Sequence, residues 1–152
     1  MRTIELKTDP ESFDASLFGD KPYEIRFNDR SYAKGDVLVL RETAHSEAEM
    51  RDGAPLVYTG RELRRVVTEV REGRGLLPGW CILGCSEEWR SVKTAPGDRV
   101  LLVACELDGP GDWRIKCGYR EDSEPTGWKV WGASWTPTRW LPLPSQAPKR
   151  EA

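Results

Sequence analysis

Apolar and polar residues alternate along several short segments of this chain, which is the pattern of half-buried β-strands. The clearest case lies in residues 21–30, where three apolar residues alternate with three polar ones: Tyr23, Ile25 and Phe27 with Glu24, Arg26 and Asn28. We predict that the apolar residues face a core and that the polar residues point together from the opposite face. At two-residue steps these polar groups lie about 7 Å apart, so they can bind one polar ligand jointly.

A helix is predicted directly before this strand. Residues 8–11, Thr-Asp-Pro-Glu, match a capping box in which the threonine accepts from an early helical amide and the glutamate reaches back. The proline fits the first turn, where no backbone donor is needed. We expect the helix to run to about Phe18 and to end at Gly19, with Phe13 and Leu17 facing a sheet.

Short strands are predicted for most of the remaining chain. In the first half we expect them at residues 4–7, 37–40, 58–70 and 80–85. The third of these should break near Gly60. In the second half we expect strands at 99–105, 113–119 and 127–131, then an extended closing segment at 140–144. Residues 43–55 are charged and lack an apolar period, so we expect an exposed loop there.

The composition changes near residues 86–88, which indicates two domains. Most tryptophans lie beyond this point, together with many Pro and Gly residues. We predict an α+β, mostly β chain. Residues 1–86 should form a small β-barrel with one N-terminal helix. Residues 87–152 should form a small tryptophan-rich antiparallel β-meander, with a largely indole core and a frayed C-terminal tail.

Charge and composition limit the possible functions. The 152 residues carry 23 Lys and Arg against 25 Asp and Glu, so no global basic field attracts nucleic acid. Any such binding must use a local basic strip. No run of 18 apolar residues is present to span a membrane, and the N-terminus lacks the apolar core of a signal peptide. We therefore expect a cytoplasmic protein, located in the host cytoplasm if it is phage-encoded.

The sequence predicts neither a metal site nor a cofactor. The four cysteines, Cys81, Cys85, Cys105 and Cys117, do not match common zinc spacings, so we expect reduced, metal-free thiols. His45 is the only histidine, and no Ser-His or Cys-His triad can be assembled around it. Gly-rich phosphate-binding motifs are also missing.

Residues 1–85 resemble a phage-associated family of unknown function within the ASCH/PUA-like superfamily. The resemblance lies in segments that occur in order: Glu5-Leu6-Lys7, Gly19-x-Lys21, Glu24-Ile25-Arg26-x-Asn28-Asp29-Arg30, Gly35-Asp36-x-Leu38, Tyr58-Thr59-Gly60-Arg61-Glu62 and Pro78-Gly79-Trp80. The superfamily implies a small β-barrel with a cleft, used mostly for RNA or modified nucleosides. Residues 88–144 look like a second uncharacterised family common in phage and prophage genomes.

Two positions depart from what the resemblance implies. The family usually has a histidine before Glu5, where this chain has Ile4. Some ASCH proteins are small amidases that act on acetylated cytidine through a lysine and a threonine. Lys21 matches the lysine, but Glu24 occupies the threonine position, which puts that reaction in doubt.

Each candidate residue has a structural and a functional interpretation. Glu24 and Arg26 are either a structural ion pair, with Lys7 or Arg61 as further partners, or the walls of a ligand cleft. Lys21 is either a solvated lysine or a phosphate contact or base. Asn28 and Arg30 form either a hairpin turn or a loop that presents the arginine to phosphate. The arginines at 61, 64, 65, 71 and 74 are interleaved with glutamates, which favours a solvated strand face.

The leading hypothesis is a non-enzymatic module that binds RNA or a nucleotide. The predicted ligand-binding residues are Lys7, Lys21, Glu24, Arg26, Asn28, Arg30 and Arg61. One alternative is a small amidohydrolase acting on a modified nucleoside, with Lys21 and Glu24 as catalytic residues. Another is an accessory factor that binds a host or defence protein through the tryptophan-rich domain.

Overall fold

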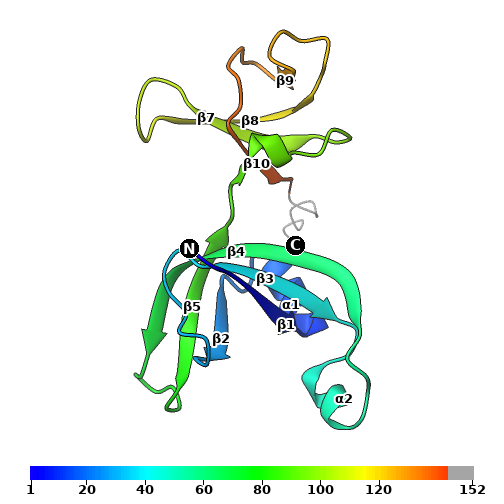
Figure 1. The fold of residues 1–152 in the computed structure, drawn as a ribbon, viewed down its shortest axis with the longest axis vertical. Helices are drawn as coiled ribbons and strands as arrows, with labels where there is room; N and C mark the ends of the chain where they lie inside the picture. The colour runs from blue at the N-terminus through cyan, green and yellow to red at the C-terminus, as the bar shows by residue number, and fades with distance from the viewer. Residues whose placement is uncertain (144–152) are drawn as a thin grey trace, which may run out of the picture. The chain divides into compact units, whose positions relative to one another are not determined.

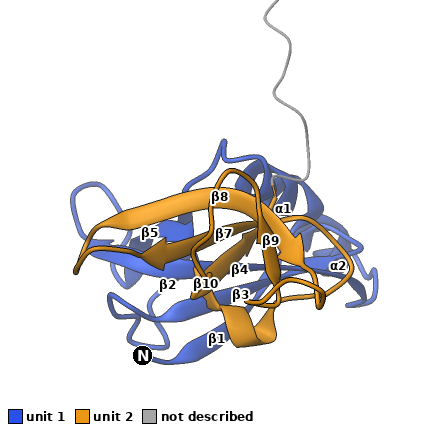
Figure 2. Cartoon of the chain, turned by 90° about the horizontal axis from the view of Figure 1, so that it is seen from above, with its two compact units in different colours: residues 1–88 blue, residues 89–152 orange. Residues whose placement is uncertain are grey.

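The structure, a computed structural model, describes residues 1–143. The chain divides into two compact units, residues 1–88 and the residues from Trp89 onward (Figure 2). Each unit contains one five-stranded sheet, so the mostly β class predicted from the sequence is confirmed. Pro144 and the tail that the sequence predicted to be frayed lie outside the described residues.

The first unit is a curled, open sheet that resembles half a barrel (Figure 1). Its strands are β1 (Thr3–Thr8), β2 (Tyr23–Phe27), β3 (Val37–Thr43), β4 (Tyr58–Glu72) and β5 (Trp80–Glu87). Their order across the sheet is β1-β3-β4-β5-β2. β1 runs parallel to β3, and the other neighbouring pairs are antiparallel. The first and last strands of the order, β1 and β2, therefore leave two free edges.

The core of this unit lies between the sheet and helix α1 (Pro10–Leu17). The strands contribute alternating apolar residues, such as Leu6, Leu38 and Leu83, and the helix contributes Phe13, which is 1% exposed. Leu17 packs against the same cluster, so the predicted helix face is confirmed. Each such side chain, when fully buried, stabilises the fold by about 1.5–3 kcal/mol.

The predicted ends of α1 are half right. The helix ends at Leu17, and Gly19 follows with φ 80°, in the left-handed conformation that glycine adopts without strain. The predicted capping box is wrong, because Thr8 is the last residue of β1 and its side chain is buried. The N-cap is Asp9, whose side chain makes no capping bond and instead accepts from the backbone N–H of Glu47 at 2.9 Å.

The predicted faces of β2 are reversed. Its apolar residues are exposed, Tyr23 by 40%, Ile25 by 45% and Phe27 by 53%, whereas Glu24 is only 2% exposed. The physical reason is that β2 is an edge strand of a strongly curled sheet. Its inner face meets α1 and a set of buried polar groups, while the apolar core is formed by other strands.

Two further expectations for the first unit are corrected. The strand predicted to break near Gly60 is a single strand, β4, but its pairing with β3 shifts register between Glu62 and Tyr58, where Gly60 takes φ 90°. The glycine therefore lies in a bulge and does not end the strand. The exposed loop predicted at 43–55 contains helix α2 (Glu47–Arg51). This helix begins with a complete capping box, in which Ser46 accepts from the N–H of Glu49 and Glu49 accepts from the N–H of Ser46.

The second unit is an antiparallel sheet with the order β6-β10-β7-β8-β9. Its elements are β6 (Arg90–Ser91), the 3-10 helix η1 (Val92–Thr94), β7 (Leu101–Glu106), β8 (Trp113–Arg120), β9 (Trp128–Val130) and β10 (Arg139–Pro142). Only β7, β8 and β9 form a meander, because β10 returns to pair between β6 and β7. The predicted antiparallel sheet is confirmed, but the predicted meander describes only these three strands.

The predicted indole core of the second unit is partly confirmed. Trp128 and Trp140 are buried with Leu101, Val103 and Val130. Trp113 and Trp131 are instead 45% and 49% exposed.

Across the described residues, no helix has both the length and the apolar character required to cross a membrane.

A candidate binding groove

An open groove of about 740 Å³ lies on the first unit. Its walls come from β1, the end of β2 with the loop that follows, β3, α2 and the start of β4. The lining residues are Glu5, Leu6, Lys7, Asp9, Arg26, Phe27, Asp29, Arg30, Tyr32, Arg41, Glu47, Met50, Leu56 and Tyr58. The volume falls within the range of about 300–1,000 Å³ that is typical of small-molecule sites.

Arginine side chains link the two free edges of the sheet beside this groove. Arg30 Nη1 donates to the backbone carbonyl of Glu5 at 2.7 Å, and Arg26 Nη2 lies 3.5 Å from Thr8 Oγ1. Arg2, which directly precedes β1, donates from Nη2 to the backbone carbonyl of Ser31 at 2.7 Å. Because these links are made by long side chains instead of strand pairing, space remains between the edges.

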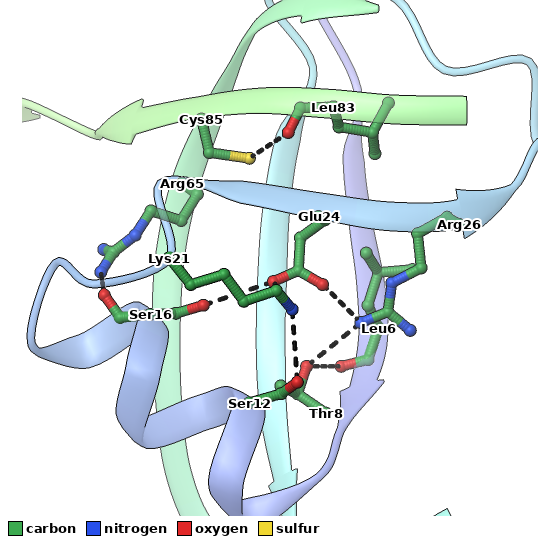
Figure 3. A network of polar contacts seen from close by, with 10 residues as sticks. All are labelled: Leu6, Thr8, Ser12, Ser16, Lys21, Glu24, Arg26, Arg65, Leu83 and Cys85. Carbon is green, nitrogen blue, oxygen red and sulfur yellow. Dashed lines mark hydrogen bonds and ion pairs between the residues drawn. The ribbon is translucent and has the colours of Figure 1, made fainter. Parts of the chain in front are cut away.

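A buried carboxylate lies behind the groove. Glu24 Oε2 accepts from Arg26 Nη2 at 2.8 Å, and Glu24 Oε1 lies 3.5 Å from Lys21 Nζ and 3.4 Å from Ser16 Oγ (Figure 3). Two cations thus face one anion in a region where water is scarce. This network supports the structural ion pair between Glu24 and Arg26, but its partners are Lys21 and Ser16, and neither Lys7 nor Arg61.

Arg26 joins this network to the groove. The hydrogen bonds of its guanidinium to Glu24 and Thr8 both use Nη2, and its Nε is buried without a hydrogen-bond partner (Figure 3). The side chain is 25% exposed and lines the groove. A guanidinium fixed at one nitrogen, with donors left over, is arranged to bind an acceptor that is not part of the protein.

Lys21 and Glu24 lie close together but are absent from the groove lining. Lys21 Nζ is 3.3 Å from Ser12 Oγ, so the lysine links a hydroxyl of α1 to the carboxylate. The thiol of Cys85 lies on the same side, and burial, reinforced by the charge of Glu24, raises its pKa to about 11. A thiol with such a pKa is overwhelmingly protonated near neutrality and is a poor nucleophile.

The other predicted site residues divide into two groups. Lys7 and Arg30 line the groove beside Arg26. Asn28 is a turn residue, which accepts from the N–H of Tyr32 at 3.0 Å and donates to Glu72. Arg61 also lies outside the lining, because it is held by Glu42 and Asp14 instead.

Arg61 is a structural residue of β4. Its Nε donates to Glu42 at 2.8 Å, and its Nη2 pairs with Asp14 of α1 at 2.7 Å. Its guanidinium carbon also lies over the Phe13 ring, 4.8 Å from the centroid. The bond from Arg61 holds the pKa of Glu42 below its usual value, against the opposing effect of burial, and Thr59 assists.

The sequence reasoning missed one side of the groove. Arg41 of β3 lies over the Tyr58 ring of β4, with 4.1 Å between the guanidinium carbon and the ring centroid. Met50 and Leu56 extend this side with apolar surface. Arg41 and Tyr58 are far apart in sequence, and the pairing of Thr43 with Tyr58 brings them together. The only local signal was an aromatic residue at the start of a predicted strand.

No group of three or more His, Cys, Asp or Glu side chains is arranged to hold a metal ion within residues 1–143. The four cysteines in this range are free.

Comparisons with known proteins place the first unit in a family. Residues 3–85 match the family described as a domain of unknown function, DUF3850. An uncharacterised 12.9 kDa protein of Escherichia phage P2 is 32% identical over 79 residues, which cover 52% of this chain and 63% of the phage protein. The chain thus spans less than two thirds of that relative. The groove and its buried network lie in the matched region, and the chain belongs to the phage-associated DUF3850 family, whose function is unknown.

Proposed function

We propose that the first unit is a non-enzymatic module that binds a nucleotide or an unpaired nucleotide of RNA in this groove. The single observation that carries the proposal is Arg26, which lines the groove, is fixed through Nη2 by Glu24 and Thr8, and keeps the donors of its other terminal nitrogen, Nη1, for a ligand. The resemblance to the ASCH/PUA-like superfamily supports the same class of ligand.

The groove offers the groups that a nucleotide needs. Arg26, Arg30 and Lys7 supply donors for phosphate or a base edge. Met50 and Leu56, beside Tyr58, supply apolar surface for the ring or sugar of the ligand.

The charge of the lining favours a short ligand. Its four cationic side chains, from Lys7, Arg26, Arg30 and Arg41, are matched by four carboxylates, from Glu5, Asp9, Asp29 and Glu47. A long single strand requires a continuous basic track along its backbone. The balanced lining supplies local contacts to one nucleotide and no such track.

A hydrolase remains the second candidate, supported by the contact of Lys21 with both Ser12 and Glu24. In that case Lys21 and Glu24 would act on a modified nucleoside. We favour binding because neither residue lines the groove and because both are engaged in contacts with each other.

The third candidate, a contact between the tryptophan-rich unit and a host protein, stays a prediction. The exposed indoles of Trp113 and Trp131 are the residues with which it would be tested.

The test of the proposal is the affinity of Arg26 variants for AMP and for a short single-stranded RNA. Arg26→Ala should weaken binding by about 2–4 kcal/mol, because a desolvated phosphate or base edge loses its charged donor. Arg26→Lys should not restore it, since a point charge cannot hold Glu24 and the ligand together. Arg71→Ala is the matched control, because Arg71 is an ion-paired arginine of β4 outside the groove.

Melting temperature must be measured beside affinity, because Arg26→Ala also leaves Glu24 buried with less compensation. A variant that melts lower yet binds normally while folded would make the pair purely structural and reject the proposal. Glu24→Gln separates the two candidates. Retained binding with loss of any hydrolase activity would favour the enzyme.

A further inference from the structure

Arg41 differs from the other cations of the groove in which part of its guanidinium is accessible to a ligand. Its Nη1 pairs with Glu5 at 3.2 Å and its Nε with Glu62 at 3.1 Å, so two of its three nitrogens are engaged along the edge of the plane. Its guanidinium carbon lies over the Tyr58 ring, 4.1 Å from the ring centroid. The side chain nevertheless remains 33% exposed and lines the groove.

These contacts hold the guanidinium plane in one orientation. Two carboxylates from neighbouring strands fix its edge, and an aromatic ring supports it from one side. The part that remains for a ligand is the face opposite Tyr58. A guanidinium face binds planar heterocycles by stacking, as arginine planes do with unpaired bases in RNA-binding proteins.

We propose that Arg41, supported by Tyr58, is the platform on which the base of the ligand stacks, and that it gives the groove a preference for purines over pyrimidines. This inference rests on the proposed function. Arg26 and Arg41 then have separate tasks. Arg26 donates hydrogen bonds to a phosphate or a base edge of the ligand. Arg41 contacts the plane of the base by stacking.

The separation follows from the chemistry of the two sites. Arg26 keeps the two donors of Nη1, which a stacked ring cannot satisfy. Arg41 is flanked by the carboxylates of Glu5 and Glu62, whose negative charges disfavour a phosphate beside it. Purines have the larger ring system and stack more strongly, so the ratio of AMP to UMP affinity measures the platform independently of the phosphate contact.

The experiment measures the affinity of the full chain for AMP and UMP in wild type, Arg41→Lys, Arg26→Ala and the control Arg71→Lys. Wild type should bind AMP about three- to tenfold more tightly than UMP. Arg41→Lys keeps the charge and removes the plane, so it should weaken AMP binding about tenfold and bring the ratio close to one. Arg26→Ala should weaken both ligands and leave the ratio unchanged, and Arg71→Lys should change neither.

The possible failures are distinguishable. Equal wild-type affinities for AMP and UMP, or an unchanged ratio in Arg41→Lys, would overturn the platform and leave the proposed function standing. If wild type binds neither mononucleotide nor single-stranded RNA, both proposals fail. If Arg41→Lys does not fold, which its melting curve shows, the wild-type ratio decides alone: a ratio of one overturns the platform, and a purine preference supports it.

Discussion

Single residues in the first unit show that most of its arginines are held by carboxylates of the same unit. The pairs are Arg2–Asp36, Arg26–Glu24, Arg30–Asp29, Arg41–Glu5, Arg51–Glu47, Arg61–Glu42, Arg64–Glu88, Arg65–Glu87 and Arg71–Glu69. The basic strip predicted from Arg61 to Arg74 is therefore largely neutralised within the fold. What remains for a ligand is the unused part of a few side chains, above all Arg26.

The pair of Glu42 and Arg61 gives a prediction about pH. The pKa of Glu42 is lowered in the fold, mainly by Arg61. A carboxyl whose pKa is lowered by folding stabilises the fold at any pH above its pKa in the unfolded state. This contribution is lost as the pH falls through its pKa in the folded state. Glu42→Gln should therefore cost about 1 kcal/mol at pH 7, a modest figure because Arg61 is half exposed and keeps Asp14.

The measurement is urea unfolding of wild type and Glu42→Gln at pH 7 and at pH 3. The difference in unfolding free energy should shrink at the lower pH, because pH 3 lies below the pKa of the unfolded carboxyl and protons then favour the unfolded state. Glu47→Gln is the control, since the pair of Glu47 with Arg51 is exposed and contributes little. A gap of equal size at both pH values would show that the charge of Glu42 is irrelevant to stability.

Individual residues of the groove differ in whether the sequence could predict them. Lys7, Arg26 and Arg30 were expected at a binding site and do line one groove. Arg41 and Tyr58 were missed because their contact depends on the register between β3 and β4, which has a bulge beside Arg41. Nothing in the local pattern of either strand encodes that register.

At the scale of elements, β2 leads to a prediction about its two faces. Ile25 is 45% exposed and Glu24 is 2% exposed, the reverse of what a simple alternation suggests. Ile25→Lys should thus change the unfolding free energy by no more than about 0.5 kcal/mol, as at other surface positions. Glu24→Ala should cost about 3 kcal/mol, because Arg26 and Lys21 lose their shared anion.

Urea denaturation of the two variants tests this assignment of faces. Ile115→Lys in the second unit, at a site 52% exposed, is a matched control for the effect of a new surface charge. If Ile25→Lys unfolds the first unit and Glu24→Ala does not, the apolar face of β2 is the buried one after all.

The elements also show where sequence patterns stop being informative. Period two correctly marked β2 as a strand, but it does not say which face is inside, because that depends on the curl of the sheet and on α1. Two segments matched the capping-box pattern, at Thr8 and at Ser46. Only the second caps a helix, because Thr8 is already committed to the pairing of β1 with β3. Competition between strand pairing and helix capping is decided by tertiary structure.

At the scale of the whole molecule, the division of the chain leads to a prediction about independent folding. The sequence placed the end of the first domain at residue 86, whereas the compact unit ends at Glu88 and β5 continues to Glu87. The two glutamates differ from an ordinary linker, because Glu87 pairs with Arg65 at 2.9 Å and Glu88 with Arg64. Residues 1–88 should therefore fold alone.

The matched comparison is the fragment 1–86, which lacks only these two residues. Arg65 is 8% exposed, so removal of Glu87 leaves a largely buried guanidinium whose other recorded acceptors are backbone carbonyls. Breaking such a pair costs up to about 3–5 kcal/mol when both partners are buried. Because Glu87 is 55% exposed, we expect a smaller loss, about 1–3 kcal/mol, and a melting temperature several degrees below that of 1–88.

Circular dichroism and amide spectra of both fragments decide the question. A cooperative transition for 1–88, with native-like amide dispersion, would establish that the core around Phe13 and Leu38 needs no contribution from the tryptophan-rich unit. Equal melting of the two fragments would show that the Arg65–Glu87 pair contributes nothing, as many partly exposed ion pairs do. An unfolded 1–88 would reject the autonomy of the unit, and binding experiments would then require the full chain, because the groove would not survive on its own.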